Sequence, residues 1–204
     1  MHALIVVAHH NPDSLTHAVA RRIALGIEAG THRHTFELAD LASEGFDPRF
    51  NLADQALFQG QASPSTEIAM EQARLDRADA LVLVYPIYWW SFPALLKGWV
   101  DRVFTNGWAY EENGNGKVIK KLRRLQVHLV AVGGAGEGTF NRHGYASAMK
   151  TQIDHGIFDY CGAQVRSSSF LLASDVGYPE SALEKADQIG ASVFMEVQGR
   201  KLAR

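Results

Sequence analysis

ADALVLVYPIYWWSFPALLKGWVDRVF, residues 78–104, is the stretch that decides the fold. It begins with an unbroken apolar run at residues 80–85, which is typical of a strand buried on both faces of a parallel sheet. Four aromatic side chains follow within PIYWWSFP, residues 86–93, whose last proline opens a helix. The apolar face of that helix consists of Leu95, Leu96, Trp99, Val100, Val103 and Phe104. The stretch therefore predicts a strand, an aromatic loop, and a helix that packs on the core or on another subunit.

The same alternation of apolar strand and amphipathic helix continues in both directions. Further strands are expected at residues 3–8, 34–41, 125–132 and 165–172, and further helices at residues 14–28, 65–78, 145–160 and 180–199. Residues 42–64 and 111–117 have the composition of surface loops. We therefore predict one α/β domain over residues 1–204, doubly wound around a five-stranded parallel sheet in the flavodoxin-like order 2-1-3-4-5.

Composition excludes several classes of partner. The 204 residues are 47% hydrophobic and carry a formal net charge of -2, so nothing favours nucleic acid or an anionic membrane. No apolar run approaches the roughly 18 residues of a membrane-spanning helix, and the N-terminal segment lacks the features of a signal peptide. Cys161 is the single cysteine, which excludes an intrachain disulfide and favours a reducing, cytoplasmic location.

Ligands of such sheets bind beyond the carboxyl ends of the strands, so the loops after the first, third and fourth strands are the candidates. The first loop is AHHNPDSLTHA, residues 8–18, and it leads into a helix whose free N–H groups favour a phosphate. Ser14 and Thr16 offer hydroxyl groups there, and His9 or His10 offers a further donor. The alternative is that these residues only form a turn and a helix cap.

The second loop contains large flat rings, and the third loop is rich in glycine. Tyr88, Trp89 and Trp90 belong to a loop of large rings, which either contact a flat ligand or cover the domain's own core. The third loop is AVGGAGEGTFNRHGY, residues 131–145, and its glycines permit close approach of the backbone to a ligand. Within it, His143 is a candidate proton donor near neutral pH. The three loops together predict a pocket that fits the flavin mononucleotide portion of a cofactor.

These residues resemble the NAD(P)H:quinone oxidoreductase family of dimeric, flavodoxin-like flavoenzymes. The resemblance is carried by AHHNPDSLTHA, by the block from SPSTEIAM to TNGWAY, and by VGGAGEGTFNRHGY with YCGAQV, over roughly residues 3–165. It implies a homodimer with bound FAD, or FMN as the alternative, which passes a hydride from NAD(P)H to a quinone in a ping-pong reaction. One bacterial branch of the family contains ancillary flavoproteins of glutathione-gated potassium efflux systems.

The resemblance also implies roles for individual residues. The flavin's phosphates and ribityl chain would contact His9, Ser14, Leu15 and Thr16. The edge of the isoalloxazine would contact Pro86, Ile87, Tyr88, Trp89 and Trp90. Gly133 and Gly134 would lie under the ring, and the catalytic His143 would settle its charge. Substrate would contact Trp90, and Trp108 and Tyr110 would reach it across the dimer.

Some features depart from the family or favour other functions. The glycine loop is shorter than in the animal enzymes, and the tyrosine that partners the histidine has no clear counterpart. A flavin-bearing regulatory subunit that contacts a membrane transporter is the main rival, and a one-electron flavodoxin is disfavoured because the chain is nearly neutral. His32 and His34 indicate a solvated strand edge, so no metal site is expected. KVIKKLRR, residues 117–124, is either a solvated basic face or a contact for the phosphates of NADPH.

Overall fold

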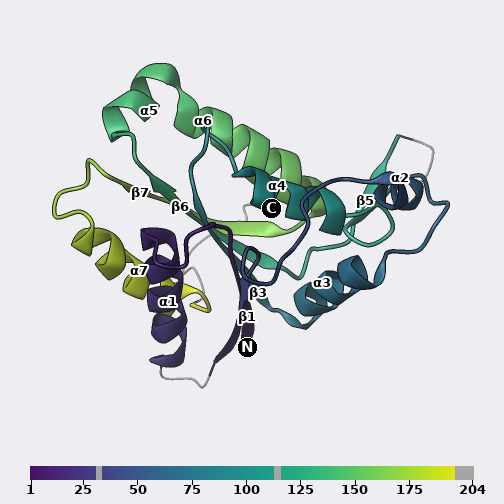
Figure 1. Ribbon diagram of the computed structural model, residues 1–204, viewed down its shortest axis with the longest axis horizontal. Coiled ribbons are helices and arrows are strands. Elements are labelled where there is room, and N and C mark those ends of the chain that lie inside the picture. The colour runs from purple at the N-terminus through teal and green to yellow at the C-terminus, as the bar shows by residue number, and fades with distance from the viewer. Residues whose placement is uncertain (31–33, 113–115, 196–204) are drawn as a thin grey trace, which may run out of the picture.

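The computed structural model describes residues 1–30, 34–112 and 116–195. Five strands form one parallel sheet in the order β2-β1-β3-β6-β7 (Figure 1). Their bounds are His2–Val7 (β1), Thr35–Asp40 (β2), Ala80–Pro86 (β3), Gln126–Gly133 (β6) and Gln164–Leu172 (β7). In chain order of the parallel strands this is 2-1-3-4-5, so the predicted α/β fold and its winding are confirmed.

Both faces of the sheet are covered, which explains the unbroken apolar runs of the central strands β1 and β3. Side chains of β1 alternate between two cores, with Leu4 and Val6 in one and Ala3 and Ile5 in the other. The helices α1 (Leu15–Glu28) and α7 (Glu180–Ser192) cover one face. The helices that cover the other face are α3 (Thr66–Arg77), α4 (Ala94–Val103) and η1 (Lys150–Asp159). The apolar stripe predicted on α4 lies mostly in this second core, with Trp99 fully buried.

Two segments expected as loops contain regular structure, so these predictions were partly wrong. Residues 42–64 include α2 (Leu52–Phe58), which is stabilised by a capping box between Asn51 and Asp54. Asp54 is buried because Arg102 donates to it at 2.9 Å. The predicted loop 111–117 overlaps a hairpin of β4 (Tyr110–Glu112) and β5 (Val118–Lys120), and residues 113–115 lie outside the described residues.

The helix predicted over residues 145–160 is present but changes its winding. It begins as α6 (Tyr145–Met149) and continues as the π-helix η1. A further short helix, α5 (Glu137–His143), fills the second half of the glycine-rich segment. Gly144, at φ 68°, separates α5 from α6 because a left-handed residue ends a helix. The last predicted helix, 180–199, ends at Ser192, and residues 196–199 lie outside the described residues.

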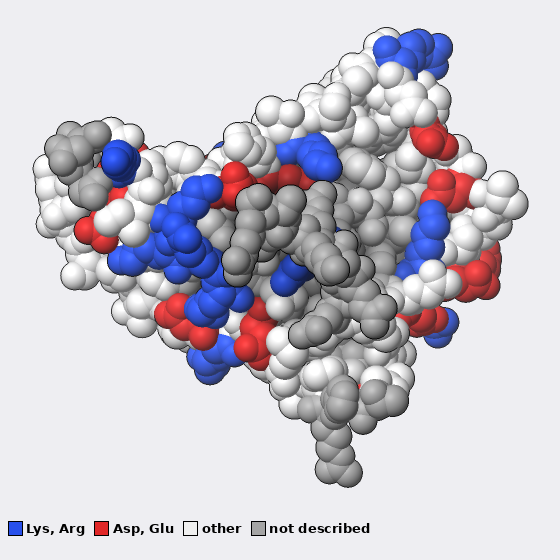
Figure 2. Space-filling view, turned by 180° about the vertical axis from the view of Figure 1, so that it is seen from behind, with Lys and Arg blue, Asp and Glu red and all other residues white. Residues whose placement is uncertain are grey.

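The basic segment 117–124 is balanced by carboxylates. Lys120 pairs with Asp159, and Arg124 pairs with Asp76. Figure 2 shows Lys and Arg side chains gathered on one part of the rear face with Asp and Glu side chains beside them. This balance favours a solvated face over a phosphate site.

Within the described ranges, no helix has both the length and the apolarity needed to cross a bilayer. The described residues also contain no group of three His, Cys, Asp or Glu side chains placed to hold a metal ion. His32, which was predicted to lie on a solvated strand edge, lies outside the described residues.

Candidate functional site

Three loops meet at one edge of the sheet, as predicted. The strands β1 and β6 flank β3, with Val7 opposite Val84 and Val132 opposite Pro86. Parallel strands end at the same edge, so the loops that follow β1, β3 and β6 lie next to one another (Figure 1). The backbone of Ile87 extends this contact by donating to Val132 O at 2.8 Å.

The first loop prepares the N-terminus of α1. Ser14 is the N-cap of this helix, and its Oγ accepts from His17 N at 3.3 Å. His9 stacks on His10 with ring centroids 4.6 Å apart, and burial followed by the charge of His10 lowers the pKa of His9. Thr16 is buried and Leu15 is half-buried. The predicted phosphate contacts therefore lie together around one helix terminus.

A hydrogen-bonded histidine in this region was missed from the sequence. His17 Nδ1 lies 2.9 Å from Ser14 Oγ, and His17 Nε2 lies 2.9 Å from Asp40 Oδ2. The other carboxylate oxygen of Asp40 accepts from the backbone N–H groups of Ala42 and Ser43. The three histidines within residues 9–17 were a signal of polar function in the sequence. The partner of His17 on β2, Asp40, could not be identified from the pattern.

The aromatic loop is a tight turn with an unusual backbone. Tyr88 and Ser91 exchange two backbone hydrogen bonds of 3.1 and 3.2 Å. Trp89 and Trp90, between them, have φ values of 48° and 60°. Such left-handed conformations cost roughly 1 kcal/mol or more each for large side chains, and strain of this kind is concentrated at functional sites. Trp89 is 93% exposed, so the turn presents one large ring to solvent.

Trp90 points the other way and joins an aromatic wall. It stacks on Tyr145 at 3.8 Å with an interplanar angle of 12°, and its edge meets Phe140 at 5.4 Å. A cavity of about 220 Å³ lies beside this wall. Its lining consists of Ile87, Trp89, Trp90, Gly133, Gly134, Ala135 and Phe140. Two of the three predicted loops thus line one cavity.

The paired glycines form its floor and fit a flat ring. A Cβ on Gly133 would come within 2.9 Å of Leu172 Cδ2 and 3.1 Å of Ile87 Cδ1, so a side chain there would have to displace the ends of these two side chains. A Cβ on Gly134 would meet nothing within 4 Å, because this glycine faces the open cavity. The floor is therefore bare backbone, with N–H and C=O groups available at the edge of a heterocycle.

His143 is placed next to the aromatic wall but outside the cavity lining. It is the last residue of α5, its side chain is exposed, and its ring centroid lies 5.2 Å from that of Tyr145. Tyr145 contacts both His143 and Trp90. The sequence offers no clear counterpart of the family's tyrosine partner, and the structure places the ring of Tyr145 beside His143.

Trp108 and Tyr110 lie elsewhere in the chain. Tyr110 lines a separate cavity of about 480 Å³, with Phe58 and Tyr160 among the other lining residues. Trp108 donates from Nε1 to Asp76 at 3.3 Å. Neither side chain lines the cavity beside Trp90.

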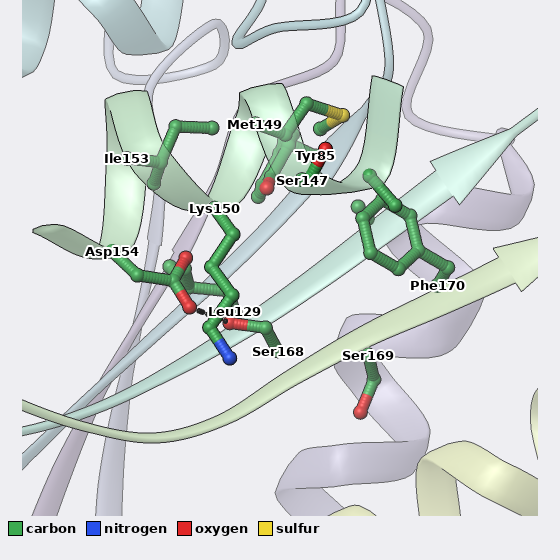
Figure 3. Close-up of a pocket in the computed structure, with 12 residues that line it drawn as sticks. Tyr85, Leu129, Ser147, Met149, Lys150, Ile153, Asp154, Ser168, Ser169 and Phe170 are labelled. Atoms are coloured by element: carbon green, nitrogen blue, oxygen red, sulfur yellow. Dashed lines mark hydrogen bonds between the residues drawn. The ribbon is translucent and has the colours of Figure 1, made fainter. Parts of the chain in front are cut away.

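A third cavity, of about 250 Å³, lies behind the aromatic wall between η1 and the strands β6 and β7 (Figure 3). At its edge, Ser168 donates to Asp154 at 2.7 Å. Tyr85 is almost fully buried here, and burial together with the charge of Asp154 raises the pKa of its hydroxyl. Phe170 lines this cavity and packs on Phe140, so the two rings separate it from the cavity beside Trp90.

Comparison with known proteins agrees with this geometry. A family model described as flavodoxin-like fold matches residues 1–192. The chain is 31% identical to the uncharacterized NAD(P)H oxidoreductase YcaK of Escherichia coli, over 82% of this chain and 81% of that protein. The chain belongs to the flavodoxin-like family that contains the NAD(P)H:quinone oxidoreductases. The predicted family is thereby confirmed, and the chain is an oxidoreductase.

Other relatives bear on its chemistry. A ribosyldihydronicotinamide dehydrogenase [quinone] of Pongo abelii is 28% identical over 87% of this chain and 84% of that protein. The potassium-efflux ancillary protein KefF of Enterobacter is 38% identical, but only over 43% of this chain and 47% of that protein.

Two solved structures share the fold. An NAD(P)H:quinone oxidoreductase from Methanothermobacter marburgensis superposes with a TM-score of 0.82 at 25% identity, covering 94% of this chain and 98% of that one. An FMN-dependent NADH-azoreductase from Bacillus anthracis, solved with FMN, has a TM-score of 0.66 at 18% identity, covering 94% of this chain and 96% of that one.

Proposed function

We propose that the chain is a flavin-dependent NAD(P)H:quinone oxidoreductase. The observation that carries the proposal is the cavity beside Trp90, which has a bare glycine floor, an aromatic wall and a helix N-terminus at one sheet edge. Relatives named as quinone dehydrogenases and the solved quinone oxidoreductase support the same reaction. FAD is the proposed cofactor, with FMN as the alternative that the Bacillus complex supports.

The protein's own residues would hold the cofactor at both ends. Ser14, Thr16 and the first N–H groups of α1 would bind its phosphate, helped by His9 and by apolar contact with Leu15. The flavin ring would lie on Gly133 and Gly134, with its edge along the backbone of residues 86–90. A cavity of about 220 Å³ is smaller than the ~300 Å³ of the smallest typical ligand pockets, so one face of the ring would stay open for reactants.

A bound flavin would supply the hydride chemistry, accepting a hydride from NAD(P)H in one half-reaction and passing it to a quinone in the next, in ping-pong order. Backbone N–H groups near Gly134 would stabilise the negative charge that develops on the ring. His143 would assist because imidazole can carry a proton near neutral pH, and Tyr145 would hold its ring in place. Trp90 would stack beside the substrate.

A homodimer belongs to this proposal. Phe50, Leu52 and Phe58 expose 52%, 83% and 57% of their surface around α2, and a neighbouring cavity contains Tyr110. Exposed apolar side chains grouped in this way mark protein interfaces. In a dimer formed through this surface, Trp108 and Tyr110 would cover the substrate of the partner chain. Burial raises the pKa of Cys161 to about 11, so this side chain stays a protonated thiol at neutral pH.

The decisive experiment is to purify the protein, record its visible spectrum, and identify the released cofactor by mass. We expect absorbance near ~450 nm that bleaches on addition of NADPH or NADH and returns with a quinone. A colourless protein that takes up neither FAD nor FMN would overturn the proposal.

A regulatory subunit of a potassium efflux transporter is the second candidate, favoured by the local similarity to KefF. This function would keep the flavin site but add a transporter contact. Co-purification with a membrane transporter from the native host, together with weak quinone turnover, would favour it.

A further inference from the structure

A chain of hydrogen bonds runs from the end of β2 to the first turn of α1. Asp40 Oδ2 and His17 Nε2 are 2.9 Å apart, and His17 Nδ1 and Ser14 Oγ are 2.9 Å apart. Asp40 is fixed from behind by the N–H groups of Ala42 and Ser43, each 3.2 Å from Oδ1. His17 is only 5% exposed, so the centre of the chain is shielded from water.

The proton positions in this chain depend on the charge of His17. An ionised carboxylate only accepts hydrogen bonds, so His17 Nε2 carries a proton whether the ring is neutral or charged. In the neutral ring, Nδ1 is an acceptor, and Ser14 must donate its single hydroxyl proton inward to it. In the charged ring, Nδ1 donates to Ser14 Oγ, and the hydroxyl proton of Ser14 is released to point outward.

A second observation at this end of α1 concerns the hydroxyl group of Thr16. Thr16 is 2% exposed, and its hydroxyl makes no hydrogen bond to any residue in the described part of the chain. Helical Cα–Cβ bonds tilt toward the helix N-terminus, so this unsatisfied donor faces the same end as Ser14. Its oxygen is not among the fully buried, unpaired side-chain atoms of the described residues, so the hydroxyl is open at this end of the helix, where an oxygen of a ligand can accept from it.

We propose that His17 and Asp40 are positioning residues that couple proton uptake to phosphate binding at the N-terminus of α1. The inference rests on the proposed flavin site, in which that phosphate belongs to the cofactor. When His17 is protonated, Ser14 donates to a phosphate oxygen and the imidazolium adds a positive charge; when His17 is neutral, Ser14 presents a lone pair instead. By reciprocity, phosphate binding must draw a proton onto His17.

Other groups near His17 also titrate, so their contributions to the pH dependence of binding must be distinguished from that of His17. The ring of His9 lies 6.2 Å from that of His17 in an edge-on contact, and His10 stacks on His9. Asp40 faces His17 from β2. The phosphate monoester of FMN itself loses its second proton near pH ~6, which strengthens its binding as pH rises and opposes the proposed effect. A variant that alters only His17 keeps all the other contributions.

The test compares FMN with riboflavin, which is the same ring without the phosphate. Apoprotein is titrated with each at pH 5.5 and pH 8 in the wild type, H17Q and D40N, and proton uptake is measured calorimetrically in two buffers. We expect the preference for FMN over riboflavin to gain about tenfold more on acidification in the wild type than in H17Q, since a charge-assisted hydrogen bond is worth about that factor. D40N should reduce the gain, because the imidazolium loses its counter-charge. At pH 8, where the phosphate is already fully ionised, proton uptake should accompany FMN but not riboflavin.

Every result of this experiment either supports or contradicts the coupling between His17 and phosphate binding. Equal pH dependence in the wild type and H17Q would overturn the inference while leaving the flavin site intact. If H17Q fails to fold, the wild type alone decides, because equal proton uptake with FMN and riboflavin also contradicts the inference. Binding of neither flavin at either pH would remove the proposed function, and this inference with it.

Discussion

Gly134 is the residue where a single side chain would decide cofactor binding without affecting the fold. A Cβ built there meets no atom within 4 Å, and its φ is not left-handed, so a larger residue is tolerated by the chain itself. The space it would enter is the cavity beside Trp90. A side chain at position 134 and the proposed ligand would therefore occupy the same volume.

We predict that G134L weakens flavin binding by about tenfold or more, equivalent to ~1.4 kcal/mol, because the leucine fills the place of the ring. The matched control is G138L, since Gly138 is also free of neighbours within 4 Å but lies outside the cavity lining. Fluorescence titration of both apoproteins with FMN and FAD measures the effect, and thermal melting checks the fold. Equal affinities in the two variants would show that the ring does not lie on Gly134.

The strand β6 contains a buried histidine, His128, whose protonation couples the stability of the fold to pH. A register shift between Val127 and His128 leaves Arg166 out of the pairing, so that His128 lies opposite Ser167. His128 Nδ1 is 2.9 Å from Ser167 Oγ, and the ring is 5% exposed. Burial lowers the pKa of His128 to about 4, because the charged imidazolium loses its hydration.

This depressed pKa predicts a loss of stability on acidification. Below pH ~6.5 the unfolded chain binds a proton at His128, whereas the folded chain does so only near pH 4. The contribution of the neutral His128 ring to the free energy of unfolding is therefore complete above pH ~6.5 and is lost as the pH falls to 4. The loss should be about 3 kcal/mol. H128N, which keeps a polar atom near Ser167 but does not titrate, should lose correspondingly less. Urea unfolding at pH 7 and pH 4 measures both proteins, and an equal loss would contradict the assignment.

At the scale of the whole molecule, the fold could be predicted because the sequence of the central strands indicates burial on both faces. β1 and β3 are apolar at every inner position, which only a sheet covered on both faces requires. The contacts that complete the site could not be predicted in this way. Asp40 meets His17 across two elements, and Trp89 and Trp90 adopt a backbone conformation that their own propensities oppose. Such features depend on three-dimensional packing, and no local pattern encodes them.

Assembly bears on the site because the chain by itself leaves Tyr110 away from the cavity beside Trp90. If the apolar surface around α2 joins two chains, replacing Phe58 by a charged residue should separate them, since a desolvated charge is costly at an interface. F58E should therefore behave as a monomer at micromolar concentration, whereas L25E should not, although Leu25 on α1 is equally exposed at 56%. Light scattering after size exclusion measures the mass.

The F58E monomer should keep its flavin but reduce quinones at least about tenfold more slowly, because Trp108 and Tyr110 would no longer cover the substrate. A monomeric wild type, or an F58E protein that remains dimeric, would rule out this surface as the interface.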